Sequence, residues 1–517
     1  MKLIVSLVFL IALNFSTLYS QLTQEWVNSY RVRGSALSLD SVGNIIVTGF
    51  RDSVICTVKY SSSGQKIWER DTVIFPSGQG IHNAVDRFGN IYITLTNGLS
   101  LLQLIKYDSS GIQKWNNHDF YPAGNVCQGI ALDTAGNIFV TCESFVGRYE
   151  YLTRKYNPSG IVVWNRQYSG NYGARTPSSI CVDISGNVYV TGSDNVDSIR
   201  HIDYATIKYN NNGDQLWVSQ YNGRISGWDI PTSVCVDKNG YCYVTGGSDY
   251  TISRASYCTI KYNSSGDSVW TRLFPTDTVG ELYSREGDFV FTDTAGNVYV
   301  AGWKYIIGSS DGWAITAMKY DSNGNMKWYK VDSAAMYSRS AVLDYKSNFY
   351  VLGDGRTYMQ GRGYDSIGNL IWSFQNTKIG YSAGKILCNR RGDIFVLSSS
   401  LDTAMLFKFS QPTIVRNENT GLINDFKLEQ NYPNPFNPTT TIKFQCPKRS
   451  NVTLKIYDII GREMETLVNE NLNAGNYNIR FNGEGLSSGV YFYKLEVRSS
   501  NSSIGKFTDV KRMVLLK

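Results

Sequence analysis

A recurring turn phrase constrains this 517-residue chain more than any other feature. An apolar run ends in an acid, the chain turns through x-x-Gly-Asn, and a second apolar run follows, at spacings of 45 to 56 residues. The acids are Asp40, Asp86, Asp133, Asp183, Asp237, Asp293 and Asp344, with Asn389 as a degenerate eighth. A period of this length is typical of propeller blades.

Each repeat also contains a second phrase, in which a Lys-Tyr strand, a Gly turn and a Trp strand follow one another. The clearest copy of both phrases reads "SICVDISGNVYVTGS" and then "YATIKYNNNGDQLWVSQY". D-x-x-G-N places an Asx residue at the turn entrance and glycine where φ must be positive, which builds a short hairpin. Metal binding by the acids is the competing interpretation, but no copy has the ligand order of a calcium loop. Each unit therefore holds two hairpins.

The tryptophan of the second phrase follows a tyrosine by eight residues in seven units. We expect the two rings of each hairpin to pack on one another and to belong to the core. These tryptophans are Trp68, Trp115, Trp164, Trp217, Trp270, Trp328 and Trp372.

The eighth unit lacks its tryptophan strand, because "AMLFKFS" is followed by "QPTIVRNENTG". An orphan strand of the right kind, "QEWVNSY" with Trp26, stands at the other end of the repeat region. Joining the two closes a ring and removes two open strand edges. The sequence predicts an all-β fold in which residues 21–410 form an eight-bladed β-propeller closed by its N-terminal strand. Seven blades are the alternative, because Ser347 replaces the turn glycine of unit seven and unit eight is degenerate.

These copies resemble the bacterial β-propeller repeat known as SBBP, whose hallmark is a strand like "TIKYNNNGDQLW" beside one like "VDISGNVYVTG". The resemblance covers roughly Gln24 to Ser410. It implies the propeller fold and carries no catalytic residues.

The N-terminus has the pattern of a cleaved secretory signal peptide over residues 1–20, with Lys2 before the apolar run "LIVSLVFLIALNF". An uncleaved anchor is the alternative, but the apolar run is short for a membrane span. No later stretch approaches that length, so we predict no transmembrane segment in the mature chain. The net charge of +7 is spread without a Lys/Arg run and gives no argument for nucleic acid as a partner.

Nine cysteines in an exported chain invite a disulfide interpretation, but the count is odd and several occupy the same slot of successive repeats. Equivalent slots of neighbouring repeats lie too far apart for a disulfide. We expect buried free thiols, with Cys235 and Cys242 as the one pair worth testing.

After a linker at 411–424, residues 425–517 show strand-like runs and glycine turns that predict a small Ig-like β-sandwich. The stretches "NYPNPFNPTTTIKF", "LKIYDIIGREMETLVN", "LSSGVYFYKLEV" and "KRMVLLK" resemble the C-terminal sorting domain of the type IX secretion system of Bacteroidetes and relatives. The resemblance implies the type IX machinery as a partner, removal of the tail, and a secreted or outer-membrane-surface location reached through the periplasm. An ordinary Ig-like adhesion module is the alternative.

One face of the predicted propeller should carry the long connections, because both tight turns of every unit fall on the other face. The three tryptophans outside the repeat, Trp228, Trp303 and Trp313, all fall in those connections, as does His201. We predict a recognition surface there for a glycan or a protein. A structural plug over the ring mouth is the alternative for the tryptophans.

Several enzyme signatures are missing: the sequence has no H-E-x-x-H, phosphate-binding loop or Cys/His cluster. We therefore predict no catalytic residue, cofactor or metal site, and a binding or scaffold protein. The alternative is a secreted polysaccharide hydrolase or lyase, with Asp203, Asp229, Glu281 and Glu286 as possible acid and base. Solvated loop charges are the simpler interpretation of these acids. A purely structural surface-layer component is a third possibility.

Overall fold

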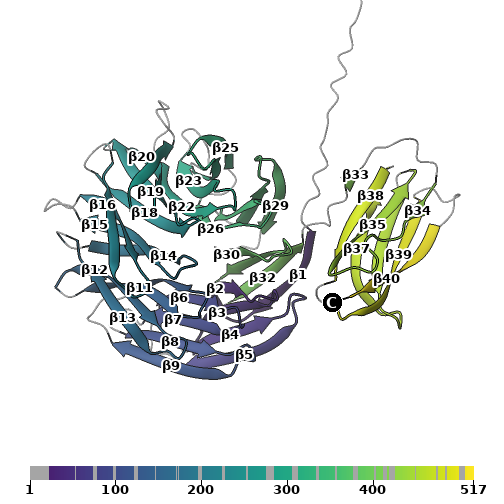
Figure 1. The fold of residues 1–517 in the computed structure, drawn as a ribbon, viewed down its shortest axis with the longest axis horizontal. Helices are drawn as coiled ribbons and strands as arrows, with labels where there is room; N and C mark the ends of the chain where they lie inside the picture. Colours follow the sequence, from purple (N-terminus) through teal and green to yellow (C-terminus); the bar gives the residue numbers. More distant parts are fainter. Residues whose placement is uncertain are drawn as a thin grey trace, which may run out of the picture. The chain divides into compact units, whose positions relative to one another are not determined.

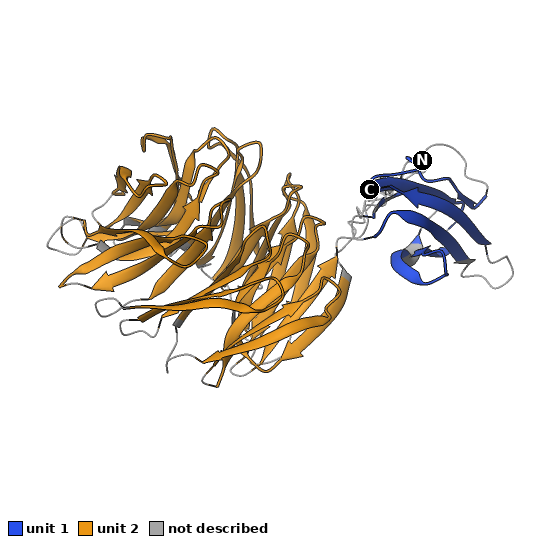
Figure 2. Cartoon of the chain, turned by 60° about the horizontal axis from the view of Figure 1, so that its bottom comes forward, with its two compact units in different colours: residues 1–23, 411–517 blue, residues 24–410 orange. Residues whose placement is uncertain are grey.

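The computed structural model describes residues 23–516 except for residues 53, 74–78, 97–100, 121–125, 146, 171, 173, 196–200, 224–226, 252–253, 275–283, 306–312, 333–336, 356–357, 377–381, 401–402, 411–415, 418–424, 449, 473–474, 484–485 and 500–506. The predicted signal peptide and most of the predicted linker therefore lie outside the described residues. The chain divides into two compact units, residues 24–410 and residues 411–517 with 1–23 (Figure 2).

The described residues of the larger unit form eight four-stranded antiparallel sheets, which we call blades 1 to 8 in the order of their first strands (Figure 1). Blade 1 consists of β2 (Arg33–Leu39), β3 (Ile45–Arg51), β4 (Val54–Tyr60) and β5 (Lys66–Val73), and blade 2 of β6 (Gln79–Val85), β7 (Ile91–Thr96), β8 (Leu101–Tyr107) and β9 (Gln113–Phe120). Blade 3 consists of β10 (Cys127–Leu132), β11 (Ile138–Phe145), β12 (Tyr149–Tyr156) and β13 (Val162–Tyr168), and blade 4 of β14 (Ala174–Val182), β15 (Val188–Asn195), β16 (Ile202–Tyr209) and β17 (Gln215–Tyr221).

Blade 5 consists of β18 (Asp229–Val236), β19 (Cys242–Thr251), β20 (Arg254–Tyr262) and β21 (Ser268–Phe274), and blade 6 of β22 (Ser284–Thr292), β23 (Val298–Tyr305), β24 (Trp313–Tyr320) and β25 (Met326–Asp332). Blade 7 consists of β26 (Tyr337–Leu343), β27 (Phe349–Asp354), β28 (Met359–Tyr364) and β29 (Leu370–Asn376), and blade 8 of β30 (Ser382–Cys388), β31 (Ile394–Ser399), β32 (Ala404–Ser410) and β1 (Thr23–Tyr30). The first strand of each blade contacts that of the next, and β30 contacts β2. The predicted all-β class and propeller architecture are confirmed.

Blade 8 takes its outer strand from the N-terminal end of the repeat region, since its order is β1-β32-β31-β30. Glu25 of β1 forms a 2.7 Å ion pair with Lys408 of β32. The ring of Trp26 lies 6.4 Å from that of Phe395 in β31. These contacts support the predicted joining of the chain ends. The count of eight blades and closure of the ring through β1 stay predictions for the protein in solution.

The recurring acids act inside their own turns. Asp40 Oδ1 accepts hydrogen bonds from the backbone N–H groups of Val42 (3.1 Å) and Asn44 (2.8 Å), while Oδ2 accepts one from the Asn44 side chain at 2.8 Å. The same three bonds recur at Asp86, Asp133, Asp183, Asp293 and Asp344. The oxygens that a cation would need thus already accept hydrogen bonds, as the turn interpretation requires.

The repeat tryptophans join neighbouring blades. Trp164 of blade 3 donates from Nε1 to the carbonyl of Asn211 in blade 4 at 3.0 Å, and Lys155 donates to the same oxygen at 3.0 Å. The Trp164 ring lies between Phe139 of its own blade and Tyr209 of blade 4, at centroid distances of 6.0 and 6.1 Å. Further tryptophans that donate to the next blade are Trp68, Trp115, Trp217, Trp270 and Trp328, to Ser109, Pro158, Ser264, Ser322 and Ser366 respectively.

The expected packing of tryptophan on the tyrosine of its own hairpin is therefore wrong. A bulge shifts the register, so that Trp164 faces Lys155 and Tyr156 faces Val162. Successive side chains of a strand point to opposite faces of the sheet. The tryptophan and the tyrosine of one hairpin consequently point to opposite sides of the blade, and each finds its partner in a different neighbour.

All nine cysteines lie among the described residues and are free. Cys235 faces Tyr243 across the hairpin of β18 and β19, whereas Cys242 faces Val236. The two thiols thus point to opposite faces of the sheet, and the pair chosen from the sequence is unsuited to a disulfide.

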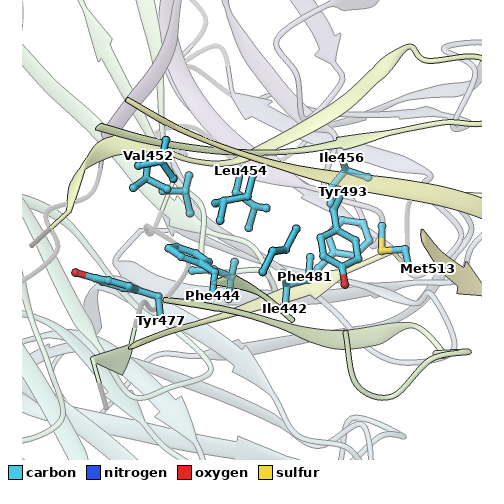
Figure 3. Close-up of a cluster of buried hydrophobic side chains, with 14 of the residues drawn as sticks. Ile442, Phe444, Val452, Leu454, Ile456, Tyr477, Phe481, Tyr493 and Met513 are labelled. Atoms are coloured by element: carbon cyan, nitrogen blue, oxygen red, sulfur yellow. The ribbon is translucent and has the colours of Figure 1, made fainter. Parts of the chain in front are cut away.

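The smaller unit is a β-sandwich of two four-stranded sheets. One has the order β33 (Arg416–Asn417), β38 (Gly475–Asn482), β35 (Thr439–Cys446) and β34 (Lys427–Leu428), and the other has β37 (Glu463–Leu472), β36 (Ser450–Tyr457), β39 (Gly489–Ser499) and β40 (Phe507–Leu515). Alternate side chains of both sheets fill the space between them, among them Ile442, Leu454 and Tyr493, each fully buried (Figure 3). β33 pairs with β38 although it falls inside the predicted linker.

The proline-rich motif at the start of this unit packs on its last strand. The backbone of Phe436 donates to the carbonyl of Val514 and accepts from Leu516, both at 2.9 Å. Asn434 Oδ1 accepts a hydrogen bond from the Val514 backbone at 2.9 Å. The stretches "NYPNPFNP" and "KRMVLLK", which lie at opposite ends of the module in the sequence, are therefore parts of one structural feature.

Candidate functional site

Three aromatic side chains gather where blades 6 and 7 meet on the face that carries the long connections. Trp303 lies near the end of β23, Trp313 begins β24 and Tyr337 begins β26, so the two tryptophans lie in strands and not in the connections in which the sequence placed them. The ring centroid of Trp303 lies 4.9 Å from Trp313 and 5.1 Å from Tyr337, and the last two are 5.7 Å apart. We call these three residues the aromatic cluster. All three are only partly buried, so their rings combine mutual packing with access to solvent.

Charged groups border the aromatic cluster. The guanidinium of Arg339 lies 5.8 Å from the centre of the Tyr337 ring and forms a 2.7 Å ion pair with Asp354 at the end of β27. Arg339 itself is exposed. The site thus offers flat apolar surface beside a fixed pair of opposite charges, a combination suited to binding a ligand with both apolar faces and polar groups.

The other two predicted ligand residues lie elsewhere, between blades 4 and 5. Trp228 is 56% exposed, and its backbone N–H donates to Asp249 at 2.9 Å. It forms an isolated bridge with Ile202, the neighbour of His201 in the chain. The bridge between Trp228 and Ile202 therefore brings Trp228 close to His201 in space. Trp303 and Trp313 are brought together by the contact of their rings.

The acids considered for catalysis do not behave as solvated loop charges. Asp229 is fully buried, with the Gly223 backbone donating to it at 2.7 Å, and burial raises its pKa. Asp203 is 3% exposed and stands directly opposite Asp194 in the pairing of β15 with β16. The expectation of solvation is wrong for both, since each lies within the protein. Glu281 and the side chain of Glu286 lie outside the described residues.

One group of described residues has the composition of a metal site. Ligand atoms of Cys56, Glu69 and Asp71 lie within 4.8 Å of one another. Arg51, however, binds both carboxylates, at 2.6 and 2.5 Å. A hydrogen bond from Lys66 is the main cause that lowers the pKa of Glu69 to about 2, and burial raises that of Cys56. The arrangement is that of an ion-pair network built around Arg51.

Sequence reasoning missed Tyr337, Arg339 and Asp354. The one signal for them in the sequence is their position at or near the end of a strand, since both ends of a propeller strand border a connection. Which side chains of those ends meet depends on a bulge between Ser338 and Ser340, where the register of β26 with β27 shifts. The sequence does not show that shift.

Two family models match the chain. The secretion system C-terminal sorting domain matches residues 430–508, and the beta-propeller repeat matches residues 163–199, within blades 3 and 4. No curated protein matches the chain in sequence.

Solved structures similar to this chain include a protein of unknown function from Bacteroides caccae, 16% identical over 59% of this chain and 93% of that one, with a TM-score of 0.32. PorZ, a surface component of the type IX secretion system of Porphyromonas gingivalis, is 11% identical over 94% of this chain and 82% of its own, with a TM-score of 0.34. A protein from Lactobacillus plantarum is 13% identical over 58% and 84%, with a TM-score of 0.40. At these TM-scores the three likenesses carry no argument.

Among the residues that the structure describes, no helix could cross a membrane. The sorting-domain match covers the sandwich from the proline-rich motif to the start of β40, and it implies contact with the type IX machinery and export to the cell surface or beyond. The chain is thus a β-propeller repeat protein that carries a C-terminal sorting domain of the type IX secretion system.

Proposed function

We propose that this protein is a binding protein of the cell surface or its surroundings, and that its propeller binds a glycan at the aromatic cluster. The observation that carries the proposal is the meeting of Trp303, Trp313 and Tyr337 across two blades on the face with the long connections. The sandwich serves export, which leaves the propeller as the part that acts outside the cell.

The chemistry of the cluster supports a sugar ligand. Aromatic faces pack against the C–H face of a sugar ring, and charged groups at the rim bind its hydroxyls. Arg339 and Asp354 stand at that rim and are held in place by their ion pair. Because the rings and the ion pair come from β-strands rather than from long loops, little ordering is needed when a ligand binds.

The two roles, binding and export, are assigned to separate parts of the chain. We infer that residues 21–410 are the part retained outside the cell and that the module 425–517 is the removable sorting tail. Deletion of 425–517 should leave a folded propeller that stays in the periplasm. Normal export of the truncated chain would contradict this assignment.

A glycan array probed with the exported protein tests the binding proposal. Any hit is titrated against wild type, Trp313→Ala and Tyr337→Ala, with Tyr345→Ala as the matched control. Tyr345 is 61% exposed and belongs to the same blade as Tyr337, but it lies in the Asp344 turn on the opposite face. We expect each cluster variant to bind at least about tenfold more weakly, since buried aromatic contacts dominate many interfaces, and the control to bind as wild type does.

Two results would contradict the proposal. Equal losses in the control and the cluster variants would place the ligand elsewhere. New reducing ends on a bound polysaccharide would replace the binding role with the polysaccharide-active enzyme considered above.

A further inference from the structure

Two cysteines of blade 3 stand directly opposite one another. Cys127 of β10 pairs with Cys142 of β11, and both side chains are almost fully buried, at 1% and 2% exposure. The backbone N–H of Glu143 donates to the carbonyl of Val126 at 3.2 Å. A bond between these two flanking residues marks Cys127 and Cys142 as a non-hydrogen-bonded pair of the antiparallel ladder.

Non-hydrogen-bonded pairs bring their side chains closest. In a regular ladder the Cα atoms of such a pair lie about 4.5 Å apart, at the near end of the range of about 4.4–6.8 Å seen in disulfides. Here the ladder is regular on the Val126–Glu143 side of the pair and bulged on the other side, between Cys127 and Gly129. Cys235 and Cys242, by contrast, are offset by one residue and point to opposite faces. Of these two pairs, only that of blade 3 has the backbone placement a bridge needs.

The packing around the pair explains why sulfur fits here and not in the next blades. The residues equivalent to Cys142 are Gly192 in blade 4 and Gly246 in blade 5. A Cβ there would lie closest to the backbone carbonyls of Thr176 and Ile230 in the paired strand, and 2.8 and 2.6 Å from the hydroxyls of Tyr151 and Tyr204. In blade 2 the position of those tyrosines belongs to Leu102, which packs in one cluster with Cys127 and Cys142. The shorter side chain leaves the space that the two sulfur atoms occupy.

We propose that Cys127 and Cys142 form a disulfide when the chain folds outside the cytoplasm, in an oxidising compartment. The two thiols lose two protons and two electrons, and the electrons reduce the disulfide of an exchange partner to two thiols. One thiolate first attacks the partner and releases one of its sulfurs, and the second thiolate then attacks the mixed disulfide and releases the other. Because the native thiols are buried, the bond forms while blade 3 assembles and before blade 2 covers it.

The two thiols have different environments in the folded chain. Burial by itself raises a thiol pKa, but hydrogen bonds from Cys142 and Thr94 bring the pKa of Cys127 below its ordinary value. The pKa of Cys142 is raised by its hydrogen bond with Cys127 and by burial. These pKa directions belong to the folded chain, in which Thr94 of blade 2 is in place, so before blade 2 covers the pair either thiol can attack first.

The test uses the exported protein, unfolded in the presence of iodoacetamide without reductant and analysed by peptide mass spectrometry. We expect the peptides that hold Cys127 and Cys142 to be linked, with the loss of two hydrogens, and the other seven cysteines to be alkylated. Protein that is reduced, unfolded and refolded with oxidised glutathione should regain the same link.

Melting with and without reductant gives a second readout that does not depend on a variant folding well. Reductant should lower the Tm of wild type and of the control Cys388→Ser by several degrees, while leaving Cys142→Ser unchanged. Alkylation of both Cys127 and Cys142 in the exported and in the refolded protein would overturn the proposal. So would a link between any other pair in their place.

Discussion

The contact between a turn glycine and the tryptophan of the preceding blade can be tested by adding a single methyl group. Gly266 has a φ of +89°, and a Cβ on it would lie 2.8 Å from two atoms of the Trp217 ring. Gly240 has a φ of +80°, and a Cβ on it would meet nothing within 4 Å. Both belong to blade 5, so Gly240→Ala reports the backbone cost alone and Gly266→Ala adds the collision with the ring.

The left-handed conformation costs an alanine about 1–2 kcal/mol, which is the expected effect of Gly240→Ala on the free energy of unfolding. Overpacking against a fixed ring adds about 1–3 kcal/mol, so Gly266→Ala should destabilise by about 2–5 kcal/mol in urea denaturation. In a Trp217→Ala background the collision with the ring disappears and only the Ser219 hydroxyl, 2.9 Å from the same Cβ, stays close, so Gly266→Ala should then cost less than it does in wild type. If Gly240→Ala and Gly266→Ala lower the free energy of unfolding equally in wild type, and if neither effect depends on Trp217, the described contact between Gly266 and the Trp217 ring is refuted.

Further predictions concern the same junctions, one strained turn and one buried acid. Trp164→Phe removes a hydrogen bond to the next blade, whereas Trp372 Nε1 has no hydrogen-bond partner among the described residues, so Trp164→Phe should destabilise by about 1 kcal/mol more than Trp372→Phe in urea denaturation. Ser347 has a φ of 65° without being glycine, and its hydroxyl donates to Asp293 of blade 6 at 3.3 Å. Ser347→Gly and Ser347→Ala both lose that hydrogen bond, but only glycine escapes the backbone strain, so Ser347→Gly should be about 1–2 kcal/mol more stable than Ser347→Ala, and equal Tm values for the two would contradict this. Burial raises the pKa of Asp194, so its folded form holds the proton more tightly than the unfolded chain does. Its contribution is then complete below the ordinary carboxyl pKa and is lost as pH rises through the raised pKa, so Asp194→Asn should gain stability over wild type as pH increases. A constant difference between the two proteins across pH 4–8 would argue against that.

The features that the sequence predicted correctly are governed by contacts within a few residues. The turn at Asp40 closes through bonds to the second and fourth residues after it, so its motif can be read directly. The same bonds form at Asp458 of the sandwich, where Arg462 takes the place of asparagine. Local turn chemistry of this kind repeats wherever its residues repeat.

The features that the sequence misassigned depend on contacts between blades or on register. Trp164 packs on Tyr209 rather than on Tyr156 because a bulge reverses the faces, and no pattern in the hairpin marks it. β37 (Glu463–Leu472) carries no clear strand signal in the sequence, because "EMETLVNENL" is largely polar and lacks apolar alternation. Tyr337 joins the tryptophans only once blade 7 lies beside blade 6.

The closure of the ring through β1 is tested most directly by supplying that strand as a separate molecule. A chain that begins at Arg31 lacks β1, so Lys408 loses its ion pair with Glu25 and blade 8 loses the ring of Trp26. We predict that this chain melts several degrees below the intact protein, and that a synthetic peptide of residues 21–30 restores the Tm while the same peptide with Trp26→Ala does not. A truncated chain that has the same Tm as the intact protein, and whose Tm does not change when the peptide is added, would contradict the closed propeller.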